Sequence, residues 1–249
     1  STLFPYTTLF RSPYSVILRR FARRRGLAAL SAGNDLTPIE SGGFSSWNEV
    51  KALAAGFERA LGVNLQVAAV YDRDFWCDEQ ISHIVADLSS HLRFAHVHRR
   101  KEVENYLLVP AVLERALDRA IAERNRRTGA CVTKSMSIDQ LLEEITHPMK
   151  SEAQALYISK RLDYFEGSGK DGKTITIDAL NIFEAKWGKM ETRMEIVAGK
   201  NVLARLRAGV AQLYDVTLTD HRIVAEFEEA EFPDDLVSLL NGLERFRTE

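Results

Sequence analysis

The stretch QVAAVY at residues 66–71, followed at once by DRD at residues 72–74, decides the fold that the sequence predicts. A near-continuous apolar run of this length is typical of a strand that is covered on both faces in a parallel sheet. The run belongs to an alternation of helical and extended patterns, which predicts a doubly wound α/β sheet. Those patterns lie at residues 14–25 (helix), 36–40 (extended), 45–61 (helix), 66–71 (strand), 78–88 (helix) and 93–98 (extended).

The composition excludes several classes of protein. The 249 residues carry 33 Lys and Arg against 35 Asp and Glu, a net charge of −2, so a surface that faces DNA would need charges segregated in space. The two cysteines are far apart, which argues against a disulfide scaffold or a zinc knuckle and favours a reducing, cytoplasmic compartment. We find no apolar stretch long enough to span a membrane and expect no membrane partner.

The chain divides into four expected parts. Residues 2–12 resemble the translation of a sequencing-library adapter, so residues 1–12 are expected to be an artefact. An α/β core follows at 13–109, then a mostly helical insertion at 110–173, and a C-terminal part with further helices at 174–249. Within the last two parts, the apolar spacing predicts helices at 111–127, 138–165, 175–187, 202–213 and 236–246, and a short extended piece at 195–197.

Two acidic residues, Asp72 and Asp74, come directly after the predicted strand. Residues i and i+2 of a strand point the same way, so we expect both carboxylates at the C-terminal edge of the sheet, where α/β proteins bind ligands. Carboxylate oxygens suit Mg²⁺ or Mn²⁺. The alternative is that one of these residues only caps the next helix.

A second acidic pair, Glu102 and Glu104, follows the next predicted strand. On a neighbouring strand edge these residues would complete one metal site or build a second, as in two-metal phosphodiester cleavage. Alternatively, they neutralise Arg99, Arg100 and Lys101 as surface ion pairs without a function.

These clusters together resemble a known family. A strand ending in DRD at 72–74, then HVH at 96–98, KEVENYLL at 101–108 and VAGKNVL at 197–203 are similar to the Toprim nuclease region of the overcoming-lysogenization-defect family of ATP-dependent endonucleases. The resemblance covers the chain from residue 13 onward. It implies a Toprim-type, Rossmann-like parallel sheet with a helical insertion.

The resemblance also implies roles for individual residues. Asp72, Asp74, Glu102 and Glu104 would bind two Mg²⁺ or Mn²⁺ ions, and Glu102 and Lys200 would act in catalysis, with Lys200 stabilising charge on the phosphate. DNA would be the substrate, and an N-terminal ATPase half would bind ATP and form a homodimer. The family's first strand, which ends in a catalytic Glu, has no counterpart in residues 1–12, so weak or absent activity is expected for this chain.

Two other functions stay open. The loop GSGKDGKT at 167–174 matches the phosphate-binding pattern GxxxxGK[ST], but a charged helix end precedes it where a nucleotide hydrolase would have a strand. The other alternative is a nucleic-acid-binding fragment without catalysis, for which the basic face of residues 19–25 is a candidate. His96 and His98 share a strand face, and we favour a packing role for them over zinc binding.

Overall fold

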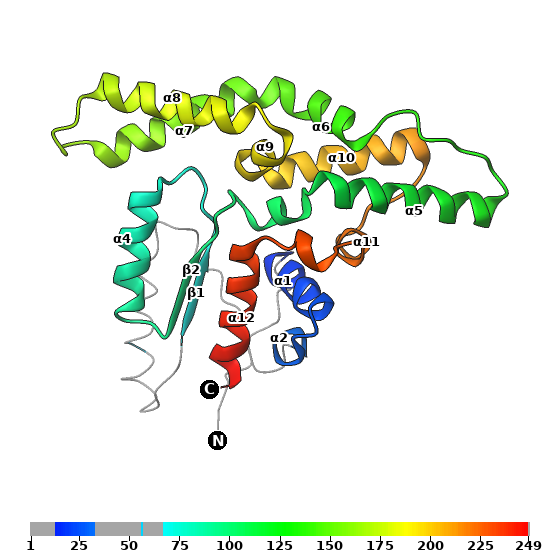
Figure 1. The fold of residues 1–249 in the computed structure, drawn as a ribbon, viewed down its shortest axis with the longest axis horizontal. Helices are drawn as coiled ribbons and strands as arrows, with labels where there is room; N and C mark the ends of the chain where they lie inside the picture. The colour runs from blue at the N-terminus through cyan, green and yellow to red at the C-terminus, as the bar shows by residue number, and fades with distance from the viewer. Residues whose placement is uncertain (1–12, 33–55, 57–66, 249) are drawn as a thin grey trace.

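The computed structural model describes residues 13–32, 56 and 67–248, and most of this part of the chain is helical (Figure 1). The predictions for residues 1–12, 36–40 and 45–61 therefore lie almost wholly outside the described residues. The helix predicted at 14–25 is confirmed as α1 (Pro13–Arg24).

The predicted strand is confirmed, and so is its partner. Strands β1 (Ala68–Tyr71) and β2 (Phe94–Val97) pair in parallel, with Ala68 opposite Phe94 and Tyr71 opposite Val97. Among the described residues the sheet contains these two strands. A broadly α/β architecture with a small parallel sheet therefore holds, whereas the larger doubly wound sheet remains a prediction.

Helices cover both faces of the sheet. Helix α4 (Asp78–Ser89) packs on one face, where Ile84 and Leu88 join Ala69 and Val97 in a small core of their own. Helix α12 (Asp234–Thr248) lies against β2 on the other face (Figure 1). A Cβ atom at Gly242 would stand 2.3 Å from the Phe94 ring, so glycine allows α12 to approach the strand this closely.

The first helices of the described chain pack against its last elements. The Phe21 ring of α1 meets Phe227 and Phe232 edge-on, at centroid distances of 5.3 and 6.1 Å. After α1, the short helix α2 (Ala28–Ala32) begins where the Glu244 carboxylate accepts hydrogen bonds from the backbone amides of its second and third residues. This carboxylate satisfies amides that a helix start leaves without partners.

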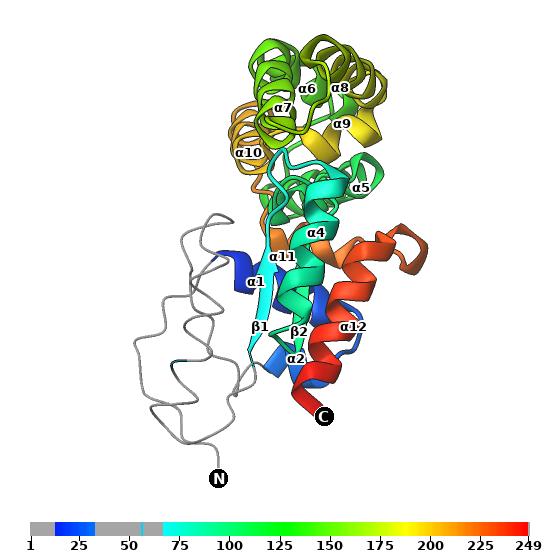
Figure 2. The same cartoon turned by 90° about the vertical axis from the view of Figure 1, so that its left-hand side faces the viewer.

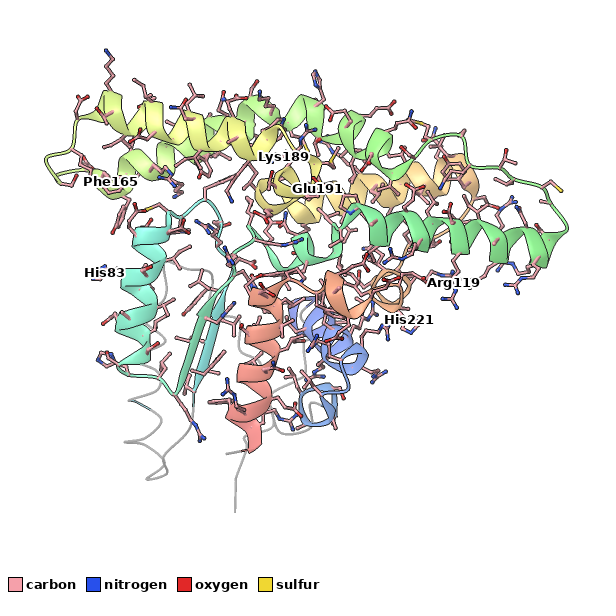
Figure 3. The ribbon with its side chains drawn as sticks, in the orientation of Figure 1. His83, Arg119, Phe165, Lys189, Glu191 and His221 are labelled. Atoms are coloured by element: carbon pink, nitrogen blue, oxygen red, sulfur yellow. The ribbon has the colours of Figure 1, made fainter. Side chains whose placement is uncertain are left out.

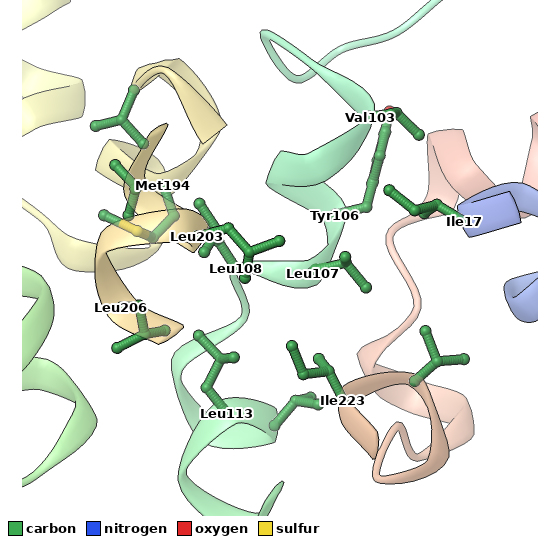
Figure 4. Packing of buried hydrophobic residues seen from close by; sticks show 14 of the residues in the cluster. Ile17, Val103, Tyr106, Leu107, Leu108, Leu113, Met194, Leu203, Leu206 and Ile223 are labelled. Atoms are coloured by element: carbon green, nitrogen blue, oxygen red, sulfur yellow. The ribbon is translucent and has the colours of Figure 1, made fainter. Parts of the chain in front are cut away.

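A short 3₁₀ helix, η2 (Val103–Leu107), lies at the centre of the main core. Figure 4 shows Val103 and Tyr106 facing α1 at Ile17, and Leu108 facing α10 (Gly199–Tyr214) at Leu203. Apolar side chains therefore anchor the segment that carries the second acidic pair.

Most of the rest of the described chain is helical, as the apolar spacing predicts, but the single helix predicted at 138–165 is interrupted by a 3₁₀ turn at residues 147–149. Figure 2 shows α6 to α10 grouped at one end of the molecule, above the sheet. The elements are α5 (Pro110–Thr128), α6 (Ile138–Thr146), η3 (His147–Met149), α7 (Lys150–Phe165), α8 (Gly172–Trp187), α9 (Met190–Ile196), α10, α11 (Asp220–Ala225) and η4 (Glu229–Glu231). Helices α7 and α8 pack along each other, and the predicted boundary at residue 173 falls inside α8.

One predicted element is wrong. Residues 195 and 196 end helix α9, and of the three residues expected to be extended only Val197 has an extended backbone. The buried Arg193 side chain explains the helix, because its guanidinium donates hydrogen bonds to the Trp187 carbonyl and to Thr146 Oγ1. These tertiary contacts override the local apolar pattern.

Candidate metal centre

Asp72 leaves the C-terminal end of β1, at the predicted edge of the sheet. Its Oδ1 accepts a hydrogen bond of 2.9 Å from the backbone amide of Val103, in η2, and lies 3.9 Å from His98 Nε2. The first helix after the strand begins at Asp78 with Cys77 at its cap position, so the alternative that Asp72 or Asp74 caps this helix is wrong. The carboxylate instead ties β1 to η2.

Asp74 is placed differently from Asp72, because the strand ends at Tyr71 and the i, i+2 rule no longer applies. Its φ is +50°, a left-handed conformation that Asp tolerates better than most residues. Its backbone amide donates to the Lys101 carbonyl, and its Oδ1 lies 3.7 Å from Lys101 Nζ. The two carboxylates therefore contact different neighbours.

The expectation that Glu102 and Glu104 lie on a strand edge is wrong. Strand β2 ends at Val97, and Glu102 is the cap residue of η2, in a reciprocal capping box with Asn105. Asn105 Oδ1 accepts from the Glu102 amide, which satisfies a donor at the helix start. This local hydrogen bonding favours a turn of helix over a continued strand.

Both oxygens of the Glu102 carboxylate have partners. Oε1 accepts from Lys101 Nζ at 2.5 Å, and Oε2 accepts from the backbone amide of Lys200 at 2.9 Å. The ion-pair alternative thus holds for Lys101, in a partly buried setting. Helix α10 begins at Gly199, three residues before the predicted start, and Glu102 supplies the anion that its N-terminus favours.

Gly199 and Asn105 form a close joint that the sequence pattern does not reveal. A Cβ atom at Gly199 would stand 2.4 Å from Asn105 Oδ1, so only glycine fits. The fully buried Asn105 donates hydrogen bonds to the carbonyls of Met194 and Val197. The joint brings residues 101–108 and 197–203, two of the segments that carry the family resemblance, into direct contact.

The carboxylates at this site repel one another. Burial, followed by repulsion from Glu104, raises the pKa of Asp72 from 3.8 to about 7, and the Val103 amide only partly opposes this. Burial and the charge on Glu102 raise the pKa of Glu104, while the ammonium of Lys200 lowers it. Lys200 thus attracts Glu104, whereas burial and the neighbouring carboxylates favour the protonated form of Asp72.

Tyr14 and the two histidines lie beneath Asp72. Tyr14 Oη stands 2.5 Å from His98 Nε2, and burial, with the charge on Asp72, raises the pKa of Tyr14. Burial lowers the pKa of both His96 and His98, which are neutral at pH 7. His96 stacks on Phe94 and His98 meets Tyr106 edge-on, which agrees with a packing role for both histidines.

Carboxylates of this kind fit a hard divalent cation by their chemistry. Throughout the described residues, no group of three or more His, Cys, Asp or Glu side chains is arranged to hold a metal ion. Magnesium does not require such a group, because one or two carboxylates, several waters and substrate phosphates suffice for it. The unneutralised pair Asp72 and Glu104 fits this description, whereas Glu102 is already occupied by Lys101 and the Lys200 amide.

The glycine- and lysine-rich loop lies apart from this centre. It joins α7 to α8, and the element before it is the helix that ends at Phe165 (Figure 3). Asp171 caps α8 by accepting from the Thr174 amide at 3.0 Å. A phosphate-binding loop follows a buried strand, so this loop has the letters of the motif without its structural context.

Three of the arginines at residues 19–25 contact the C-terminal elements. Arg20 pairs with Asp220 at 3.1 Å, the Arg24 guanidinium donates to the Phe227 carbonyl, and Arg25 pairs with Glu229. These contacts fasten α1 to the C-terminal elements, so they leave fewer charges to follow a phosphate backbone.

Comparison with protein-family models, with curated proteins and with solved structures found no match to this chain. In the stretches of chain that the structure describes, no helix has both the length and the apolar character needed to cross a bilayer.

Proposed function

We propose that the chain is a Toprim-type nuclease region that hydrolyses DNA phosphodiesters with a divalent metal, Mg²⁺ or Mn²⁺. In this proposal an ATPase half like that of the resembled family supplies ATP binding and dimer formation. One observation carries it. Three of the resembled segments, at residues 72–74, 101–108 and 197–203, meet at one end of β1 through Asp72, Glu102 and Asn105.

A bound metal ion would activate water and offset charge on the phosphate. Asp72 and Glu104 lie outside the ion pair that Lys101 forms with Asp74 and Glu102, so they are the proposed ligands of the first ion. Lys200, at the N-terminus of α10 and beside Glu104, is placed to attract a phosphate oxygen. A second ion would need Asp74 and Glu102.

Calorimetry with Mn²⁺ tests the metal site. Changes in the surroundings of metal ligands alone cost roughly 10–100-fold in affinity, so we expect Asp72→Asn to weaken binding by at least about 30-fold. The matched control is Asp163→Asn, an exposed carboxylate on α7. Equal Mn²⁺ affinity in the wild type and in Asp72→Asn would refute the proposed site.

DNA binding separates the nuclease from the non-catalytic alternative. We expect Mn²⁺ to strengthen binding of a short DNA duplex by the wild type but not by Asp72→Asn, when both are measured by fluorescence anisotropy at fixed salt. Binding that depends on salt, ignores the metal and survives Asp72→Asn would instead identify a nucleic-acid-binding protein without catalysis.

A further inference from the structure

Lys101 is held by the carboxylates that the sequence assigns to a metal. Its Nζ lies 2.5 Å from Glu102 Oε1 and 3.7 Å from Asp74 Oδ1. The same nitrogen stands 5.1 Å from the centroid of the Phe75 ring, in cation–π geometry. Only 11% of the side chain is exposed, so the ammonium is sequestered between the two acids.

The backbone of Lys101 is fixed on both sides. Its amide donates to the Glu195 carbonyl at 2.8 Å, and its carbonyl accepts from the Asp74 amide at 2.9 Å. The left-handed turn at Asp74 thereby wraps onto Lys101. A lysine on a free surface loses rotamer entropy when it forms an ion pair, whereas this one is already confined by packing.

The acids of the centre therefore fall into two pairs. Asp74 and Glu102 share the Lys101 ammonium, and Glu102 also binds the Lys200 amide. Asp72 lies outside this ion pair, because its Oδ1 accepts from the Val103 amide and stands 3.9 Å from His98 Nε2. Of the two cation positions that four carboxylates could offer, one is thus already filled by a side chain.

We propose that Lys101 is a built-in cation of the centre, which takes the position between Asp74 and Glu102 where a second divalent ion would bind. The chain then binds one divalent ion, at Asp72 and Glu104. This inference rests on the proposed function. It replaces the two-metal expectation with one metal ion and one tethered ammonium, a compact charge that neutralises carboxylates but cannot activate water as a metal does.

The number of Mn²⁺ ions bound, measured by calorimetry, tests this proposal. We expect one ion for the wild type and one for Lys101→Arg, which keeps the charge. Lys101→Met keeps an apolar stem over Phe75 but frees Asp74 and Glu102, and we expect it to bind two ions. Two ions in the wild type, or one in Lys101→Met, would overturn the role of Lys101 and leave the proposed function standing.

A second pair of variants keeps Lys101 in place, in case Lys101→Met fails to fold. We expect Asp74→Asn to leave the Mn²⁺ affinity within threefold, and Glu104→Gln to weaken it more than tenfold. A tenfold loss of Mn²⁺ affinity in Asp74→Asn would show that the Asp74 carboxylate binds the metal ion although it is paired with Lys101. Absence of Mn²⁺ binding in the wild type and in every variant would overturn the proposed function itself.

Discussion

The turn at residues 71–74 and the loop at residues 167–174 both carry sequence patterns associated with phosphate chemistry, yet the fold treats them differently. The first follows a half-buried parallel strand and is held by the Val103 backbone amide of η2 and by Lys101. The second joins two helices, and its Asp171 carboxylate caps α8. The difference teaches that a short motif gains chemical meaning from the element before it and from the distant residues that contact it.

The hydrogen bonds of Asn105 give the largest expected difference between the two regions. Asn105→Ala leaves the Met194 and Val197 carbonyls and the Glu102 amide without their side-chain partner. Because each buried polar group left unpaired costs about 1–3 kcal/mol, we expect the free energy of unfolding to fall by about 3 kcal/mol in urea denaturation. A loss below about 1 kcal/mol would mean that the joint does not hold the site together.

The close approach at Gly199 gives the next effect. An added Cβ meets Asn105, whose side chain and backbone amide lie 2.4 and 2.9 Å away, so we expect Gly199→Ala to destabilise the protein by about 2 kcal/mol. Gly209→Ala is the control on the same helix, because no atom lies within 4 Å of its Cβ position. Gly209→Ala should stabilise the protein by roughly 0.5–1 kcal/mol. An equal loss of stability in both variants would contradict the close contact between Gly199 and Asn105.

Asp72→Asn should stabilise the metal-free protein at pH 8. The pKa of Asp72 is raised to about 7 in the folded protein against 3.8 in the unfolded chain, so its ionisation opposes folding progressively from pH 4 to pH 7 and fully above. The side chain is 36% exposed, so we discount the effect for solvent screening to about 1–2 kcal/mol. Thermal unfolding with a chelator should show the gain at pH 8 and little of it at pH 4.

The smallest effect is expected in the loop. Lys173→Ala should change the free energy of unfolding by less than about 0.5 kcal/mol, because the residue is exposed. Isothermal titration with ATP should show no difference between this variant and the wild type. Nucleotide binding that Lys173→Ala abolished would reverse the comparison and favour a nucleotide hydrolase.

Much of the fold follows from local patterns. The apolar run before Asp72 predicts β1, and the spacing of Val202, Leu206 and Val210 predicts α10. The placement of Glu102 and Glu104 fails because η2 is fixed by long-range contacts, which leave no periodic signal. The same reason hides Tyr14 and Asn105, whose partners lie 84 and up to 92 positions away.

The candidate site was predictable in its residues but not in its pairing. Two acids after an apolar strand indicate a cation site, and the structure brings Asp72 and Glu104 close enough to repel each other. The sequence does not reveal that Lys101 pairs with Asp74 and Glu102, because a lysine next to a glutamate is usually solvated. The turn at Asp74 and the ring of Phe75 help to confine it.

The packing of α1 against the last elements bears on how the protein is made. Contacts such as those from Arg24 to Phe227 and from Leu30 to Glu244 join residues 203 and 214 positions apart. During synthesis the apolar face of α1, with Phe21 at its centre, cannot be buried until the C-terminal helices have left the ribosome. Folding should therefore be slow for a largely helical chain, with a late step that engages chaperones.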